Sequence, residues 1–286
     1  MMLAEFKHTL RRLRGQIIGW GIGVGLYGLL MALLYPSIAE MGEDLFETYI
    51  DIFPDAMLAM FENLHAITTP MGYMDVYFFS YMHLIIGIMA ISSGAGLIAA
   101  DEERGILDLV LAHPVSRTAL FSGRLLGLAL ALTLILGIGW LSWALPAGSV
   151  GLGLSWLELL LPFLPLLALL LLFAAVALLF SMVMPAARIA GMLTGALMVA
   201  NYLLLTLSRI DDRLEPLVRF TPLNYYQGGA AVDGLDGNSP ASLLAAAALA
   251  TVVSSFLFLR RDIRVGGERG WSLPSLKPGF RRKQSQ

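Results

Sequence analysis

LLLPFLPLLALLLLFAAVALLFSM, residues 159–182, is a stretch without a single charged side chain. A helix needs about 20 mostly apolar residues to cross the hydrocarbon core of a membrane. The stretch is long enough, and its apolar residues do not alternate with polar ones as they would along a barrel strand. Pro162 and Pro165 lie near one end, where a lost backbone hydrogen bond costs least. Residues 159–182 therefore predict a transmembrane helix.

Five more stretches of this kind occur along the chain: 16–35, 77–100, about 122–145, 189–207 and 241–259. Inside hydrocarbon the backbone must satisfy its own hydrogen bonds, and unbroken apolar segments do so as helices. The predicted fold class is therefore all-α. We expect a polytopic membrane protein with six transmembrane helices, forming a single domain over residues 1–286.

The overall composition agrees with a membrane protein. Of the 286 residues, 57% are hydrophobic and 14% are charged, whereas a soluble domain carries roughly 25% charged residues. The net charge of −2 gives no indication of a nucleic-acid partner, and we expect none. The absence of cysteine excludes disulfides, thiolate metal sites and cysteine nucleophiles.

Lys and Arg are distributed unequally between the two sides of the predicted membrane, and this bias sets the orientation. With both termini in the cytoplasm, 16 of the 19 basic residues are cytoplasmic, and the outer segments keep only Arg209, Arg213 and Arg219. The outer loop 36–76 has eight acidic residues and no Lys or Arg. We therefore expect cytoplasmic termini, with a tail over 260–286, and short helices packed on the outer mouth in the loop 36–76.

Residues 3–17 carry apolar side chains at helical spacing, separated by mostly basic ones. This pattern predicts an amphipathic helix in the cytoplasmic interface of the membrane, before the chain turns into its first span. A simple polybasic anchor that fixes the orientation is an equally good interpretation, and the two are compatible.

The connection between the second and third spans, residues 101–117, reads DEERGILDLVLAHPVSR. Asp101, Glu102 and Glu103 precede an apolar stripe, and acidic residues favour a helix N-terminus. Pro114 ends the helix, because the residue before a proline avoids the α region. The segment is therefore predicted to form a short cytoplasmic helix that presents a patterned face to a partner.

This connection resembles the segment after the second span of ABC-2-type transporter permeases. The residues that carry the resemblance are Glu102, Glu103, Gly105, Leu107, Pro114, Ser116, Arg117, Gly123 and Arg124. The outer segment before the last span is also similar, with Thr221, Pro222, Tyr225 and Tyr226. The resemblance implies a coupling helix that docks in a groove of a cytoplasmic ATPase. The ATPase-coupling residues that it implies are Glu102, Glu103, Arg104, Gly105, Leu107, Pro114, Ser116 and Arg117.

The same resemblance implies partners for the chain. An ATP-binding cassette ATPase subunit would bind ATP and magnesium, and a second permease copy or paralogue would complete the substrate pathway in the lipid bilayer. The chain itself is not expected to be an enzyme or to hold a cofactor, since none of its three lysines follows a glycine, as a phosphate-binding loop requires. We expect an exporter in the cell membrane of a prokaryote.

Three polar residues inside the spans are candidates for the substrate pathway: His83, Asn201 and Tyr202. Ionisable groups in a membrane are functional hypotheses by default. Hydrogen bonds to neighbouring groups, or between helices, explain the same residues without a transport role. Both interpretations stay open at the level of sequence.

The alternative function is a non-transport membrane protein, such as an intramembrane hydrolase or a scaffold for a membrane complex. A serine hydrolase needs a base within reach of its nucleophile, but Ser92 and His83 lie about 14 Å apart along one predicted helix. A metal site is not expected either, because the Glu102–Glu103 pair lacks companion histidines.

Overall fold

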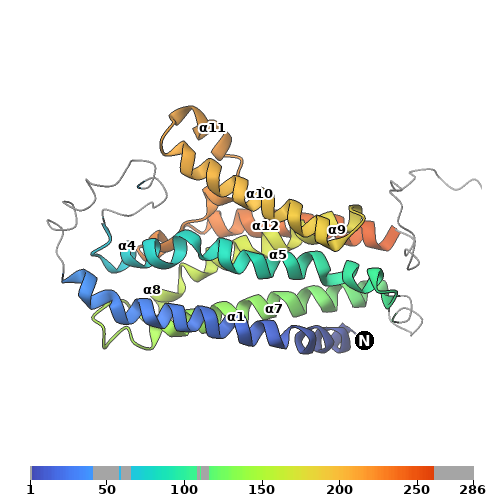
Figure 1. Ribbon diagram of the computed structural model, residues 1–286, viewed down its shortest axis with the longest axis horizontal. Coiled ribbons are helices and arrows are strands. Elements are labelled where there is room, and N and C mark those ends of the chain that lie inside the picture. The colour runs from blue at the N-terminus through green and yellow to red at the C-terminus, as the bar shows by residue number, and fades with distance from the viewer. Residues whose placement is uncertain (1, 41–57, 59–65, 108–109, 111–115, 261–286) are drawn as a thin grey trace, which may run out of the picture.

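The computed structural model describes residues 2–40, 58, 66–107, 110 and 116–260, and every regular element among them is helical (Figure 1). Six helices are long: α1 (Met2–Ala39), α5 (Ser80–Glu103), α7 (Arg117–Ala144), α9 (Phe163–Val183), α10 (Ala187–Ser208) and α12 (Asn238–Arg260). Each is long and apolar enough to cross a membrane, α5 and α9 together with the short helices in front of them. The prediction of an all-helical protein with six transmembrane helices is confirmed.

Short elements precede or connect these helices. They are α4 (Pro70–Met74) and the π-helical turn η2 (Asp75–Phe79) before α5, α8 (Trp156–Leu160) before α9, and η3 (Asp212–Leu214), α11 (Glu215–Val218), η4 (Pro222–Tyr225) and η5 (Gly228–Val232) before α12. Figure 1 places α4 and α8 at the end of the bundle away from the N-terminus. Of the predicted outer loop 36–76, α4 is a short helix as expected, whereas residues 41–57 and 59–65 lie outside the described residues.

α1 continues unbroken from Met2 through its transmembrane part. The predicted turn between an interfacial helix 3–17 and the first span is therefore wrong. Close packing against α7 explains the difference: a Cβ added to Gly127 would lie 2.8 Å from Cβ of Thr9, and one added to Gly123 would lie 2.8 Å from Cβ of Glu5. Glycines allow two helices to approach closely, so they hold the amphipathic end of α1 on the bundle.

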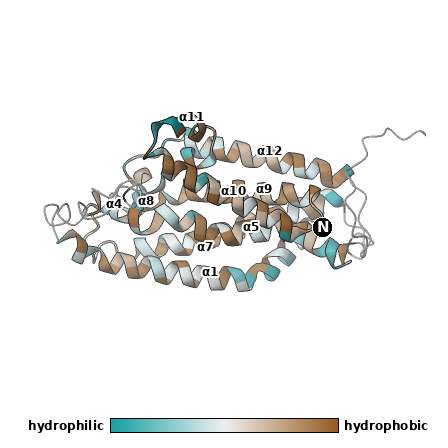
Figure 2. Cartoon of the chain, turned by 45° about the horizontal axis from the view of Figure 1, so that its top comes forward, coloured by the Kyte–Doolittle hydropathy of each residue, from teal (hydrophilic) through white to brown (hydrophobic). Residues whose placement is uncertain are grey.

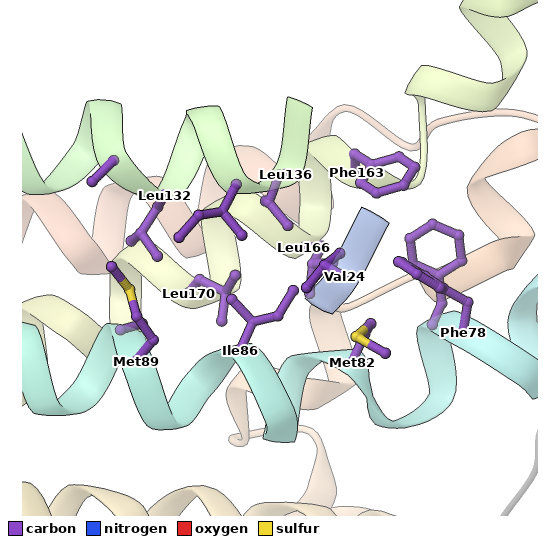
Figure 3. Packing of buried hydrophobic residues seen from close by; sticks show 14 of the residues in the cluster. Val24, Phe78, Met82, Ile86, Met89, Leu132, Leu136, Phe163, Leu166 and Leu170 are labelled. Carbon is purple, nitrogen blue, oxygen red and sulfur yellow. The ribbon is translucent and has the colours of Figure 1, made fainter. Parts of the chain in front are cut away.

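α9, which contains most of the stretch 159–182, lies in the middle of the bundle and contacts α5, α7, α10 and α12. Figure 3 shows Leu166 and Leu170 among side chains from neighbouring helices. Large side chains of α9 that are at most 1% exposed include Leu166, Leu169, Leu170 and Phe173. A helix that is apolar on all sides is suited to such a central position. Pro162 is its N-cap and Pro165 lies in its first turn, where no backbone bond is lost.

The outer surface of the bundle suits a lipid environment. Figure 2 shows hydrophobic residues along the helices, with hydrophilic residues gathered near α11 and near the N-terminal end of α1. α1 packs mainly on α7 and leaves large apolar side chains exposed, among them Ile18, Ile22, Leu26 and Leu30. Exposed apolar surface on this scale is expected where lipid replaces water.

Candidate coupling site and membrane groove

α5 ends at a glycine turn. Gly105 has φ +66°, a conformation that glycine adopts without steric cost. The N–H of Ile106 donates to the carbonyl of Asp101 at 2.9 Å, and the N–H of Gly105 donates to the carbonyl of Glu102 at 3.0 Å. This pair of bonds is the Schellman motif, which satisfies the last carbonyls of a helix. The glycine of the predicted coupling segment therefore has a backbone function, to reverse the chain directly after α5.

The acidic triplet 101–103 ends a helix rather than beginning one, contrary to the prediction. Negative charge at a helix C-terminus is unfavourable by itself. Two arginines compensate for it: Arg124 of α7 lies 2.7 Å from Oδ2 of Asp101, and Arg12 of α1 lies 3.1 Å from Oδ1. The tertiary arrangement thus overrides the local preference of the acidic residues.

Arg124 is the most deeply placed member of this charge network, with 2% of its surface exposed. Its Nη1 also donates to the carbonyl of Leu97 at 2.9 Å, and its Nε lies 3.4 Å from a carboxylate oxygen of Glu5. The network of Glu5, Arg12, Asp101 and Arg124 therefore joins α1, α5 and α7. Sequence reasoning did not assign it, although Glu5 and Arg12 are seven residues apart and so share one face of α1.

Glu103 connects the same turn to α10. Its Oε1 accepts a hydrogen bond of 2.6 Å from the N–H of Ala187, the first residue of α10. A carboxylate stabilises a helix N-terminus by accepting from its free N–H groups and by its charge. Glu102, by contrast, is buried, with 6% of its surface exposed. Among the described members of the triplet, only Glu103 is exposed toward solvent.

The remaining predicted coupling residues, and Ile106 beside them, divide into buried, capping and exposed groups. Leu107 is 1% exposed and belongs to the core, whereas Arg104 and Ile106 are exposed. Ser116 caps α7 by accepting from the N–H of Ala119 at 3.2 Å, and Arg117 donates to the carbonyl of Phe258 in α12. Residues 108–109 and 111–115, including Pro114, lie outside the described residues. The exposed surface of the described turn is therefore formed by Glu103, Arg104 and Ile106.

The structure brings two of the three predicted pathway residues together. The rings of His83 and Tyr202 lie 5.7 Å apart, with Tyr226 5.4 Å from His83. These residues line a cavity of about 30 Å³, which has room for little more than a water molecule. Asn201 donates to the carbonyl of Leu197 in its own helix at 2.7 Å, so the expected hydrogen bond between helices is replaced by one within α10.

The serines of α5 make local and interhelical bonds. Ser92 donates to the carbonyl of Met89 at 3.1 Å, and Ser93 donates to Gln16 of α1 at 2.8 Å. Neither bond involves a histidine. This geometry gives no support to the hydrolase alternative.

A larger groove of about 540 Å³ lies between α5 and α10. Its lining is mainly apolar and includes Leu84, Ile88, Ile91, Met192, Met198 and Val199. Gly191 and Gly195 form part of its wall, and a Cβ added to Gly195 would meet no described atom within 4 Å. Two pairs of glycines, each four residues apart in the sequence, therefore differ: Gly123 and Gly127 pack against α1, whereas Gly191 and Gly195 leave room for an occupant.

Six apolar helices, four of them joined by a polar turn at one end, define a polytopic membrane protein. The chain belongs to the ABC-2 family of transporter proteins, whose family model matches residues 5–263. The match spans all six transmembrane helices almost completely and identifies the chain as a transmembrane permease of the ABC-transporter type. A comparison with curated proteins gave no match.

Proposed function

We propose that this permease is half of the membrane pathway of an ABC exporter, driven by separate cytoplasmic ATPase subunits that bind ATP and magnesium. The observation that carries the proposal is that four spanning helices meet at the turn after α5. Asp101 binds α1 and α7 through Arg12 and Arg124, and Glu103 caps α10. A force applied to the exposed Arg104 and Ile106 would therefore act on α1, α5, α7 and α10 together.

The groove between α5 and α10 is the proposed wall of the substrate pathway. Both of its helices are held by the turn, one through its C-terminal residues and the other through its capped N-terminus. Rigid shifts of packed helices are a common form of coupled motion. A second permease facing this groove would enclose the pathway, and closure of the ATPases would change the separation of α5 and α10. No catalytic step is assigned to this chain.

Ile106→Asp is expected to weaken coupling to the ATPase. Ile106 is 41% exposed on the turn. An aspartate at this position would lose the apolar contact with the ATPase, and docking would require its charge to be desolvated. Loss of a contact worth about 1.4 kcal/mol would lower the affinity about tenfold. The measurement is co-expression with a candidate ATP-binding cassette ATPase subunit, followed by pull-down and by ATPase assay of the purified complex.

Phe220→Asp is the matched control, because Phe220 is 89% exposed but lies in the segment between α10 and α12, remote from the turn. It should leave both the pull-down and the ATPase rate unchanged. Equal copurification and equal ATPase stimulation for Ile106→Asp and the parent protein would contradict the coupling role of the turn. Failure of any ATPase to copurify with the parent would favour a scaffold instead.

Single cysteines test the proposed orientation, since the chain contains no cysteine of its own. Glu40→Cys follows α1 at the end proposed to be external, and Arg104→Cys lies on the turn proposed to be cytoplasmic. A membrane-impermeant maleimide should label position 40 in intact cells and position 104 only after permeabilisation. The reverse pattern would place the turn outside and exclude contact with a cytosolic ATPase.

A further inference from the structure

A second, polar cavity lies between α1 and α5, near the charge network. Its volume is about 320 Å³, within the range of small-molecule sites. Its polar lining consists mainly of Thr9, Arg12, Gln16, Ser93, Arg104 and Arg124. Among the described residues, no acidic side chain lines it: Asp101 and Glu5 contact the arginines but are not part of the cavity wall. Its lining therefore offers three guanidinium groups and several uncharged hydrogen-bonding groups.

The three arginines are not equivalent. Arg12 and Arg124 are each paired with Asp101 and are thereby fixed in position. Arg104 is exposed and forms no ion pair with any described residue. Guanidinium groups bind phosphate oxygens through parallel hydrogen bonds. The cavity thus combines two positioned guanidinium groups with a third, that of Arg104, which pairs with no described carboxylate.

The polar cavity and the apolar groove adjoin each other along α5. Ser92 lines both of them, and Figure 1 shows α5 lying between α10 and α1. The groove itself has Arg188 near its polar end, at the start of α10, and only apolar or small side chains farther along. The face of the bundle formed by α1, α5 and α10 therefore has arginines lining the cavity nearer the turn and mainly apolar side chains lining the groove.

We propose that this face binds an amphiphile whose phosphate-bearing anionic headgroup lies in the cavity with Arg12, Arg104 and Arg124, and whose apolar tail lies in the groove between α5 and α10. Basic pockets between transmembrane helices on the cytoplasmic side are suited to acidic headgroups. The ligand class deepens the proposed function and rests on it, because the groove is the proposed wall of the substrate pathway.

The test measures lipid binding to the purified full-length chain without an ATPase, so that it does not depend on coupling. Phosphatidic acid and phosphatidylcholine with the same acyl chains are titrated separately, and bound lipid is counted by native mass spectrometry. Inorganic phosphate is the free-anion probe. We expect phosphatidic acid to bind in preference to phosphatidylcholine, and inorganic phosphate to compete poorly because it lacks a tail.

Two variants locate the binding. Arg104→Gln removes one cationic contact and is expected to weaken binding of phosphatidic acid about fivefold. Gly96→Leu fills the cavity without changing its charge, since the nearest atom to an added Cβ is Cβ of Ala100 at 3.6 Å. Arg11→Gln and Gly19→Leu are the matched controls, because both positions are exposed on α1 and neither lines the cavity. Both controls should bind as the parent does.

Three outcomes would overturn the proposal. Equal affinity for the two lipids would show that the site does not recognise an anionic headgroup. Equal losses of affinity in the test and control variants would indicate general attraction to a basic surface. Binding of inorganic phosphate as tightly as phosphatidic acid would indicate a soluble anion and no tail in the groove. If the lipid preference holds while no ATPase copurifies, the binding site stands and the proposed coupling fails. If an ATPase copurifies but the lipid preference is absent, the proposed coupling stands and this ligand is excluded.

Discussion

Arg124→Met is expected to lower the free energy of unfolding by about 3 kcal/mol, because it leaves the buried carboxylate of Asp101 without its closest partner. Arg124 is 2% exposed and lies 2.7 Å from that carboxylate. Arg12 would keep its contact with Asp101, yet its side chain is 34% exposed and cannot replace the buried guanidinium. The measurement is the unfolding curve of the purified protein in detergent, recorded against denaturant concentration or temperature.

The charge of Asp101 provides an internal test of this explanation. In the Arg124→Met background, Asp101→Asn should recover part of the lost stability, because the uncompensated charge is removed. Arg14→Met is the control: Arg14 is exposed on α1 and forms no ion pair with any described residue, so a change within about 0.5 kcal/mol is expected. If the Arg124→Met protein is as stable as the parent, the network does not hold α1, α5 and α7 together.

Gly94→Leu is expected to destabilise the bundle by about 3 kcal/mol, the upper end for overpacked cores. A Cβ added to Gly94 would lie 2.9 Å from Cα and 3.0 Å from the carbonyl carbon of Ala174, so α5 would meet the backbone of α9. A backbone cannot rotate away as a flexible side chain does. Because α9 contacts most of the other spans, the shift would disturb the whole core.

Gly96→Leu, two residues farther along α5, is the matched control for Gly94→Leu. An added Cβ there has no contact closer than 3.6 Å, so the protein should unfold at nearly the same temperature as the parent. The two variants have the same change in volume and helix propensity, which isolates the contact with α9. Equal destabilisation at both positions would show that packing against Ala174 is not the reason why α5 fails to tolerate a larger side chain at position 94.

Much of the fold was predictable from short segments of sequence. The number of spans follows from local apolar length, because each helix in hydrocarbon must satisfy its own backbone. The stretch 159–182 was identified as a span from its composition alone, and its N-terminal prolines fell at the start of α9. Gly105 and Ser116 were singled out as members of a motif, and their structural contributions, a helix-ending turn and a helix cap, are also local.

Other features could not be predicted, because they depend on which helices are neighbours. His83 and Tyr202 were selected for their polarity, but the distance between them and the size of their cavity are set by the packing of α5 on α10. The buried state of Glu102 and Leu107 likewise depends on elements distant in sequence. A pattern of residue types does not specify these contacts.

The sequence by itself determined that this protein lies in a membrane and that it has six membrane-spanning helices. Hydrophobicity and length are properties of one segment at a time. Only the tertiary structure decided that the acidic triplet ends α5, that α1 continues without a turn, and that Gly191 and Gly195 border a groove while Gly123 and Gly127 do not. The physical reason is that the energy of a charge or a small side chain in a membrane depends on its neighbours. Those neighbours, such as Arg12 and Arg124 around Asp101, come from helices far apart in the chain.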